Sequence, residues 1–213
     1  MIKAILFDLN GVLIDSERIN IEVWKKVFEN YGLEFDERLY VQLIDGRTTK
    51  EIAQEFVGGE KIREFVELKD RIWYELFEEK GVTVFDDTIP FLIELKSRNI
   101  KTAVISSSRK VKFILECLDM SQYFDIVIGG GDIVCGKPSP EIVLKAMNFL
   151  NMDTSEVALV EDSIAGLDAG KKAGVYCIAI RRNEKNVFIE YDQLINNLSE
   201  IKLKYKEVND EQI

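Results

Sequence analysis

The chain alternates short apolar runs with segments whose apolar residues recur at helical spacing. Runs that are apolar throughout are typical of parallel strands that are buried on both faces of a sheet. The expected strands are residues 2–7, 102–105, 126–128, 157–160 and 175–180. Helical patterns separate the last four of these runs. This alternation predicts an α/β fold with a doubly wound, Rossmann-like parallel sheet as its core.

Residues 16–81 break this alternation with patterns that are helical throughout. Apolar residues at helical spacing end at Gly32, Thr48-x-x-Glu51 has the form of a capping box, and a further long helix is expected to end at Gly81. We expect this block to be a cap inserted above the carboxyl edge of the sheet, where open α/β sheets bind ligands. The predicted organisation is a discontinuous core domain, residues 1–15 and 82–213, and an all-helical cap domain, residues 16–81.

The chain contains no histidine, which excludes several mechanisms. A Ser-His-Asp or Cys-His mechanism and a histidine-ligated metal are all ruled out. The 38 acidic and 28 basic residues give a formal net charge of -10, which argues against a nucleic-acid partner. No apolar run approaches the roughly 18–20 residues that span a membrane. The three cysteines form no CxxC pair, so we expect a cytoplasmic protein; the oligomeric state stays open.

Four polar segments follow expected strands, where the strand ends of a parallel sheet converge on one crevice. They are residues 8–12, 106–109, 136–140 and 160–163. Each has a chemical and an ordinary interpretation. Asp8 suits a nucleophile, a metal ligand or a turn, and the serines at 106–108 suit a phosphate or a helix cap. Lys137 suits a phosphate, a carboxylate or a surface turn, and Glu161 with Asp162 suits Mg²⁺ or a helix cap.

Together and in this order, the four segments resemble the motifs of the haloacid dehalogenase superfamily. The resemblance covers essentially the whole chain, and the helical insertion has the place of the cap in the phosphoglucomutase-like and phosphoglycolate-phosphatase-like branch. It implies that Asp8 is the nucleophile that takes the phosphoryl group as an aspartyl-phosphate. It also implies that Ser106 binds a phosphate oxygen and that Lys137 offsets the negative charges. The other residues expected around the phosphate are Gly11, Ser107 and Arg109.

The same resemblance implies a Mg²⁺ site. Its ligands would be Asp8, the backbone carbonyl of Asn10 and Asp162, with Glu161 close by. The metal and a lysine would together let an anionic carboxylate attack an anionic phosphate. The function implied is that of a Mg²⁺-dependent phosphatase acting on a small phosphorylated metabolite.

Asn10 departs from the family's phosphatases, which carry an aspartate at this position. There the aspartate protonates the leaving oxygen and then activates the water. An amide cannot relay a proton, so we expect activity to be lower by roughly 10²–10⁴-fold. Asparagine is isosteric with aspartate, and the residue is interpreted either as an engineered trap or as a natural impairment. Asn10 also leaves open a non-catalytic module that binds a phosphorylated ligand.

The expected cap departs from the family pattern as well. Asn20 stands where several relatives have a histidine, and Thr49 aligns with the arginine that anchors the distal phosphate in sugar-phosphate mutases. Arg47, two residues earlier, is either a substitute for that arginine and part of the substrate site or a solvated loop residue. Asp86 and Asp87 replace the usual Pro-Gly pair before the second motif. These departures favour a phosphatase over a mutase.

Overall fold

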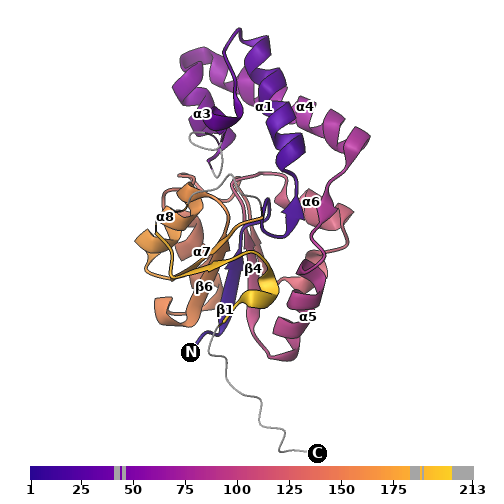
Figure 1. The fold of residues 1–213 in the computed structure, drawn as a ribbon. Helices are drawn as coiled ribbons and strands as arrows, with labels where there is room; N and C mark the ends of the chain where they lie inside the picture. The colour runs from indigo at the N-terminus through magenta and orange to yellow at the C-terminus, as the bar shows by residue number, and fades with distance from the viewer. Residues whose placement is uncertain (41–43, 45–46, 183–187, 189, 203–213) are drawn as a thin grey trace, which may run out of the picture.

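The core of the molecule is a six-stranded parallel sheet in the computed structural model, which describes residues 1–40, 44, 47–182, 188 and 190–202 (Figure 1). The strand order is β5-β4-β1-β6-β7-β8, and each neighbouring pair is parallel. The strands are Ala4–Phe7 (β1), Lys101–Ile105 (β4), Ile126–Ile128 (β5), Val157–Glu161 (β6), Tyr176–Ile180 (β7) and Gln193–Ile195 (β8). The predicted doubly wound sheet is confirmed, with β1 between β4 and β6.

Helices cover both faces of this sheet. They are α5 (Thr88–Ser97), α6 (Val111–Cys117), α7 (Glu141–Leu150) and α8 (Ile164–Ala173). Ile5 and Phe7 of β1 pack into the same apolar cluster as residues of α5 and α6, whereas Ala4 and Leu6 pack with residues of α7 and α8. Because successive side chains of a strand point to opposite faces, a strand covered on both sides must be apolar throughout.

A layer of helices, which we call the cap, lies above the carboxyl ends of the strands (Figure 1). Its helices are α1 (Glu17–Asn30), α2 (Glu37–Leu39), α3 (Thr49–Phe56) and α4 (Ile62–Lys80), with a short 3₁₀ helix at Gly59–Lys61. Aromatic rings join them: Phe28 of α1 lies 5.0 Å from Phe56 of α3 and 6.3 Å from Phe65 of α4, between ring centroids. These edge-on contacts bury large apolar areas and hold the three helices together.

Two short strands connect the cap to the core. β2 (Ile14–Asp15) and β3 (Thr83–Val84) pair antiparallel, so the chain enters and leaves the cap at one place. The Thr48–Glu51 capping box is confirmed at the start of α3, and Gly81 ends α4. The sequence did not predict β2, β3 or β8: β2 and β3 have only two residues each, and β8 begins with the polar Gln193, so it does not form a continuous apolar run as β5 does. A domain division at residues 16 and 81 stays a prediction.

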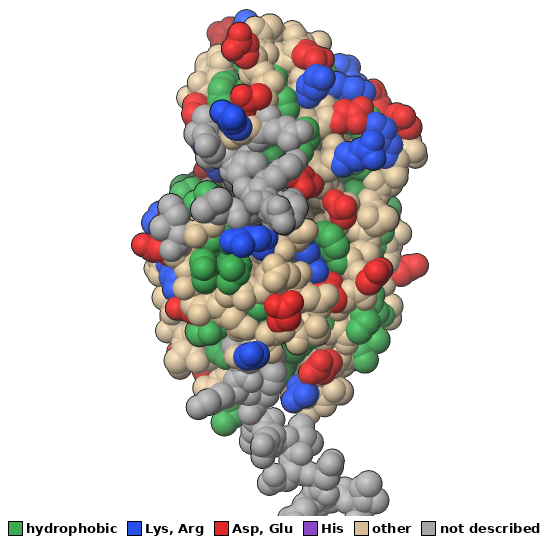
Figure 2. Space-filling view, in the orientation of Figure 1, with side chains coloured by type: hydrophobic (Ala, Val, Ile, Leu, Met, Phe, Trp, Pro, Cys, Tyr) green, Lys and Arg blue, Asp and Glu red, His purple; other side chains and the backbone are tan. Residues whose placement is uncertain are grey.

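The surface carries both signs of charge. Figure 2 shows acidic and basic side chains interspersed over the cap and the core on the face in view. Among the residues that the structure describes, no helix combines the length and the apolar character that a membrane span requires.

Candidate active site

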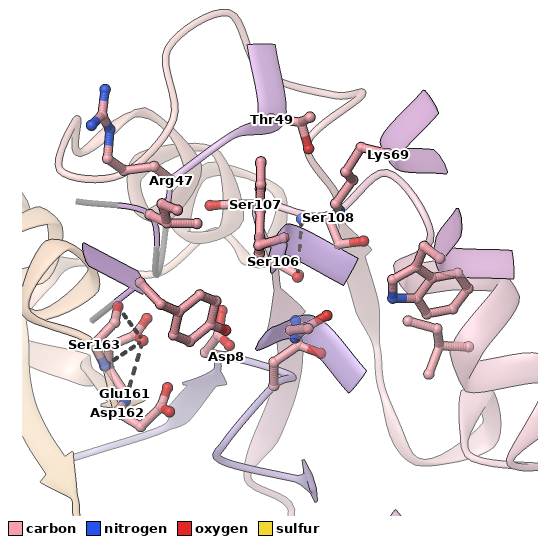
Figure 3. A pocket seen from close by; sticks show the side chains of 17 residues that line it. Asp8, Arg47, Thr49, Lys69, Ser106, Ser107, Ser108, Glu161, Asp162 and Ser163 are labelled. Carbon is pink, nitrogen blue, oxygen red and sulfur yellow. Dashed lines mark hydrogen bonds between the residues drawn. The ribbon is translucent and has the colours of Figure 1, made fainter. Parts of the chain in front are cut away.

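Asp8 lies directly beyond the central strand β1, at the carboxyl edge of the sheet. It is 7% exposed, and its backbone N–H donates to the carbonyl of Val160 at 3.0 Å. Because β1 lies between β4 and β6, the ends of those strands place Ser106 and Glu161 on either side of Asp8. Figure 3 shows these residues around one pocket beneath the cap. The sequence segments predicted to converge do so at Asp8.

Lys137 binds two carboxylates in the interior of the protein. Its side chain has no exposed surface, and its Nζ lies 2.5 Å from Oδ1 of Asp8 and 2.6 Å from Oε2 of Glu161. Burial lowers the pKa of Lys137, but the two negative charges outweigh burial and hold that pKa above its usual range. The lysine therefore carries its positive charge at neutral pH, one ammonium group beside two acids.

Glu161 is held by several donors besides Lys137. Its Oε1 accepts from the backbone N–H of Ser163 at 3.1 Å, from the Ser163 hydroxyl at 2.9 Å and from the N–H of Asp162 at 3.2 Å. Ser163 also caps α8, because its hydroxyl oxygen accepts a hydrogen bond from Gly166 N–H. The helix cap is therefore Ser163 and not Asp162. Glu161 is 1% exposed, and its bonds orient it toward Lys137.

Three acidic side chains offer a site for a metal ion. One carboxylate oxygen from each of Asp8, Glu161 and Asp162 lies within 4.8 Å of the others. Oxygen ligands of this kind suit Mg²⁺. Gly11 allows the close approach: its φ is +72°, and a Cβ there would lie 1.8 Å from Oδ2 of Asp162. The donor set fits the metal that the sequence implied, and Gly11 lies against Asp162.

Asn10 lines the pocket two residues beyond Asp8. The buried hydroxyl of Ser16 donates to Oδ1 of Asn10 at 2.7 Å, and Nδ2 of Asn20 donates to the Ser16 oxygen at 3.2 Å. Asn20 also lines the pocket. Ser16 therefore orients the Asn10 amide through its oxygen. Sequence reasoning missed Ser16, which lies between two residues that it did select.

The segment after β4, which the sequence predicts to bind phosphate, lies only partly at the pocket. Ser106 and Ser107 line the pocket, and Ser106 is buried. Its Oγ accepts from Ser108 N–H at 3.2 Å. Arg109, expected near the phosphate, is exposed and not among the residues that line the pocket. The chain turns into α6 at this point and directs the next side chain, Lys110, into the interior.

The cap supplies the upper wall of the pocket (Figure 3). Its pocket-lining residues are Asn20, Trp24, Tyr40, Ile44, Arg47, Thr49, Lys69 and Trp73. Arg47, for which the sequence left a substrate-site role and a solvated loop role open, lines the pocket, and its guanidinium binds Glu55 at 2.8 Å. Burial, and then the charge of Lys110, lowers the pKa of Lys69 to about 7. The sequence analysis did not select Lys69. The pattern that could have identified it is its spacing of four residues from Trp73, which places both side chains on one face of a helix.

A cap carboxylate also reaches the core next to Lys137. Oε1 of Glu51 accepts from Gly136 N–H at 3.0 Å, while Oε2 accepts from Thr48 within the capping box. A Cβ at Gly136 would lie 2.4 Å from Oε2 of Glu51 and 2.5 Å from Cγ2 of Thr48. Glycine at this position is therefore what lets the cap approach the lysine segment.

Solved structures share this arrangement of sheet and cap. The chain superposes on β-phosphoglucomutase from Clostridium difficile with a TM-score of 0.84 and 25% identity, over 95% of this chain and 94% of the other. An aspartate-to-asparagine mutant of CbbY from Rhodobacter sphaeroides, in complex with xylulose-(1,5)bisphosphate, superposes with a TM-score of 0.80 and 25% identity, over 94% and 96% of the two chains.

Phosphatases are among the relatives in sequence. Phosphoglycolate phosphatase of Aquifex aeolicus is 34% identical over 191 residues, which cover 81% of each chain. Validoxylamine A 7'-phosphate phosphatase of Streptomyces hygroscopicus subsp. limoneus is 28% identical over 207 residues, or 95% of this chain and 97% of the relative. The pattern that defines haloacid dehalogenase-like hydrolases matches residues 5–180. The chain therefore belongs to the haloacid dehalogenase-like hydrolase family.

Proposed function

We propose that this chain has the machinery of a Mg²⁺-dependent phosphatase that acts on a small phosphorylated metabolite through an aspartyl-phosphate at Asp8. The observation that carries the proposal is the buried group of Asp8, Lys137 and Glu161 beside Asp162, at the sheet edge that the cap covers. The names of the relatives, which are phosphatases and phosphomutases of phosphorylated sugars and metabolites, support the same class of reaction.

The residues have distinct tasks in this mechanism. A carboxylate oxygen of Asp8 attacks phosphorus, and the bond from phosphorus to the leaving oxygen breaks. The Ser106 hydroxyl binds a phosphate oxygen, and Lys137 offsets the charge that the carboxylate and the phosphate bring together. Glu161 keeps Lys137 in place. Mg²⁺, held by Asp8 and Asp162, would supply further positive charge to the phosphate when bound.

Asn10 limits the reaction in this chain. The leaving oxygen needs a proton and the attacking water must lose one, and an amide does neither. We infer that the chain binds phosphorylated substrates and turns them over slowly. The structural neighbour that is an aspartate-to-asparagine mutant holds a sugar bisphosphate, which fits binding without rapid turnover.

The test is to restore the acid. The Asn10→Asp variant should release phosphate from p-nitrophenyl phosphate roughly 10²–10⁴-fold faster than the parent chain. Release should require Mg²⁺ and disappear when Asp8→Asn is added. Equal rates for parent and Asn10→Asp would refute the proposed role of position 10. No covalent phosphate on Asp8 in the parent, under mass spectrometry after quenching in acid, would favour a binding module.

A second candidate is a sugar-phosphate mutase, since β-phosphoglucomutases are among the relatives in sequence and structure. A mutase must hold a second phosphate at the cap, and here the Arg47 guanidinium is bound to Glu55. The geometry therefore favours the phosphatase. Conversion of glucose 1-phosphate to its 6-isomer by the Asn10→Asp variant, without free phosphate, would reverse this choice. A cytoplasmic location stays a prediction.

A further inference from the structure

Lys110 is a buried charge that the chemistry described above does not use. It precedes α6 in the core, yet its side chain, 5% exposed, contacts the cap. Its Nζ forms an ion pair with Asp70 of α4. The same Nζ lies 5.2 Å from the ring centroid of Trp73 and 5.5 Å from that of Tyr74. One turn of α4 thus surrounds the ammonium group with a carboxylate and two aromatic faces.

The next turn of α6 extends the same contact. The ring of Phe113 lies 5.5 Å from Tyr74, 5.6 Å from Phe77 and 6.5 Å from Trp73. Figure 1 places α6 at the base of the cap, near α4. The aromatic rings supply apolar area and Lys110 supplies a specific, directional contact. The contact joins the cap to the core, so it exists only while these two parts are together.

The free energy of the Lys110 contact depends on the position of the cap. Burial lowers the pKa of Lys110, and the bond to Asp70 acts in the opposite direction. A buried ammonium is tolerated because it is paired; when the cap moves away, water takes the place of both partners. The pocket as it stands has about 70 Å³ of free space, room for a few water molecules. A sugar phosphate therefore needs the cap to open.

Hydrogen bonds connect Lys110 to the phosphate-binding serine. Lys110 N–H donates to Oγ of Ser108 at 3.1 Å, and Ser108 N–H donates to Oγ of Ser106 at 3.2 Å. On the cap side, Lys69 and Trp73 line the pocket next to Asp70. Residues 106–110 of the core and 69–73 of the cap therefore form the contact between core and cap and also line the pocket.

We propose that Lys110 is a positioning residue that latches the closed cap, through Asp70, Trp73 and Tyr74, and couples closure to the placement of Ser106. The latch itself does not depend on the proposed phosphatase activity; its effect on Ser106 rests on that function. We name these four residues the Lys110 latch.

Tryptophan fluorescence tests the latch without any turnover. Trp24 and Trp73 are both buried in the cap, and in a Trp24→Phe background acrylamide quenching reports the exposure of Trp73. Lys110→Met and Asp70→Asn should each shift the ratio of closed to open molecules by about tenfold and so raise the quenching constant. Lys110→Arg, which keeps the charge, should behave as the parent.

The matched controls are exposed charges on the same two helices, changed as Lys112→Met and Glu75→Gln. Neither should alter quenching. If Lys110→Met quenches as the parent does while its circular dichroism shows that it is folded, the latch is overturned. If the double variant Lys110→Met/Asp70→Asn shows the sum of the single effects, the two residues do not act as a pair and the latch is likewise overturned.

Kinetics test the coupling to Ser106. In the Asn10→Asp background, Lys110→Met should lower kcat/KM for p-nitrophenyl phosphate by about tenfold, with Lys110→Arg restoring most of it. Increased quenching with unchanged kcat/KM would overturn the coupling to Ser106. An inactive Asn10→Asp protein would refute the proposed function instead, and the quenching result would still decide the latch.

Discussion

Removing the Lys137 ammonium should cost this protein a large part of its stability. The side chains of Lys137, Asp8 and Glu161 are 0%, 10% and 1% exposed, and the lysine contacts both acids. Methionine keeps the length of the side chain but leaves two buried carboxylates without their cation. Breaking a buried ion pair costs about 3–5 kcal/mol, and repulsion between the two acids places Lys137→Met in the upper half of that range.

The sign of the pH dependence follows from the pKa of Lys137, which is raised in the folded protein. Such a group contributes its full stabilisation below its unfolded pKa of about 10.4, so the whole contribution is present at neutral pH and is lost above the folded pKa. Lys137→Met lacks this group, so its deficit relative to the parent should be constant between neutral pH and about pH 9 and should shrink only above about pH 10.4.

Urea unfolding followed by far-ultraviolet circular dichroism, in a buffer with EDTA, measures both effects. The control is Lys172→Met, whose ion pair with Asp168 joins side chains 49% and 45% exposed; it should change stability by less than about 0.5 kcal/mol. A loss below about 1 kcal/mol in Lys137→Met at neutral pH, or a deficit that grows as the pH rises above about 10.4, would refute the argument from burial.

Other sites give further predictions. Lys69→Met should reduce proton uptake on binding of inorganic phosphate near neutral pH, because an anion raises a pKa now held at about 7; calorimetry in buffers of different ionisation heat measures this. Gly11→Ala should weaken Mg²⁺ binding in calorimetric titration and cost about 1–3 kcal/mol, since φ is +72° and the Cβ would strike Asp162. Asp87→Ala should cost about 1.5–3 kcal/mol in thermal unfolding, because it strips Arg182 of a bidentate partner at 2.7 and 2.9 Å.

The convergence of Asp8, Ser106 and Glu161 could be predicted from sequence because it follows from topology. Apolar runs locate the strands, the parallel arrangement brings their carboxyl ends to one edge, and the residue after each strand must lie there. Neither the angle of a side chain nor the exact end of a helix is needed. The same reasoning places Lys137 near the edge, and the resemblance to a family assigns its task.

What topology does not determine is the direction of individual side chains. Arg109 and Lys110 are adjacent cations, and the start of α6 decides that Arg109 faces solvent and Lys110 the cap. Asp87 is a similar case. The sequence shows that it replaces part of the usual Pro-Gly pair, but it does not show that Asp87 forms an ion pair with Arg182, which lies far along the chain. Contacts between distant segments depend on packing in three dimensions, which spacing in the sequence does not encode.

Glu51 determines where the cap is easiest to lift. When the cap moves, its carboxylate keeps the two local donors of Thr48 and gives up one bond, to Gly136 N–H, a net loss of about 0.5–1.5 kcal/mol. On the side held by Lys110, opening must instead hydrate an ammonium group and separate the Phe113 ring from the rings of α4. We therefore expect the cap to tilt as it opens, with the Glu51 edge rising first and the Lys110 latch on α4 separating last. A ligand would then enter beside α3, past Thr49, and reach the pocket that Lys69 lines.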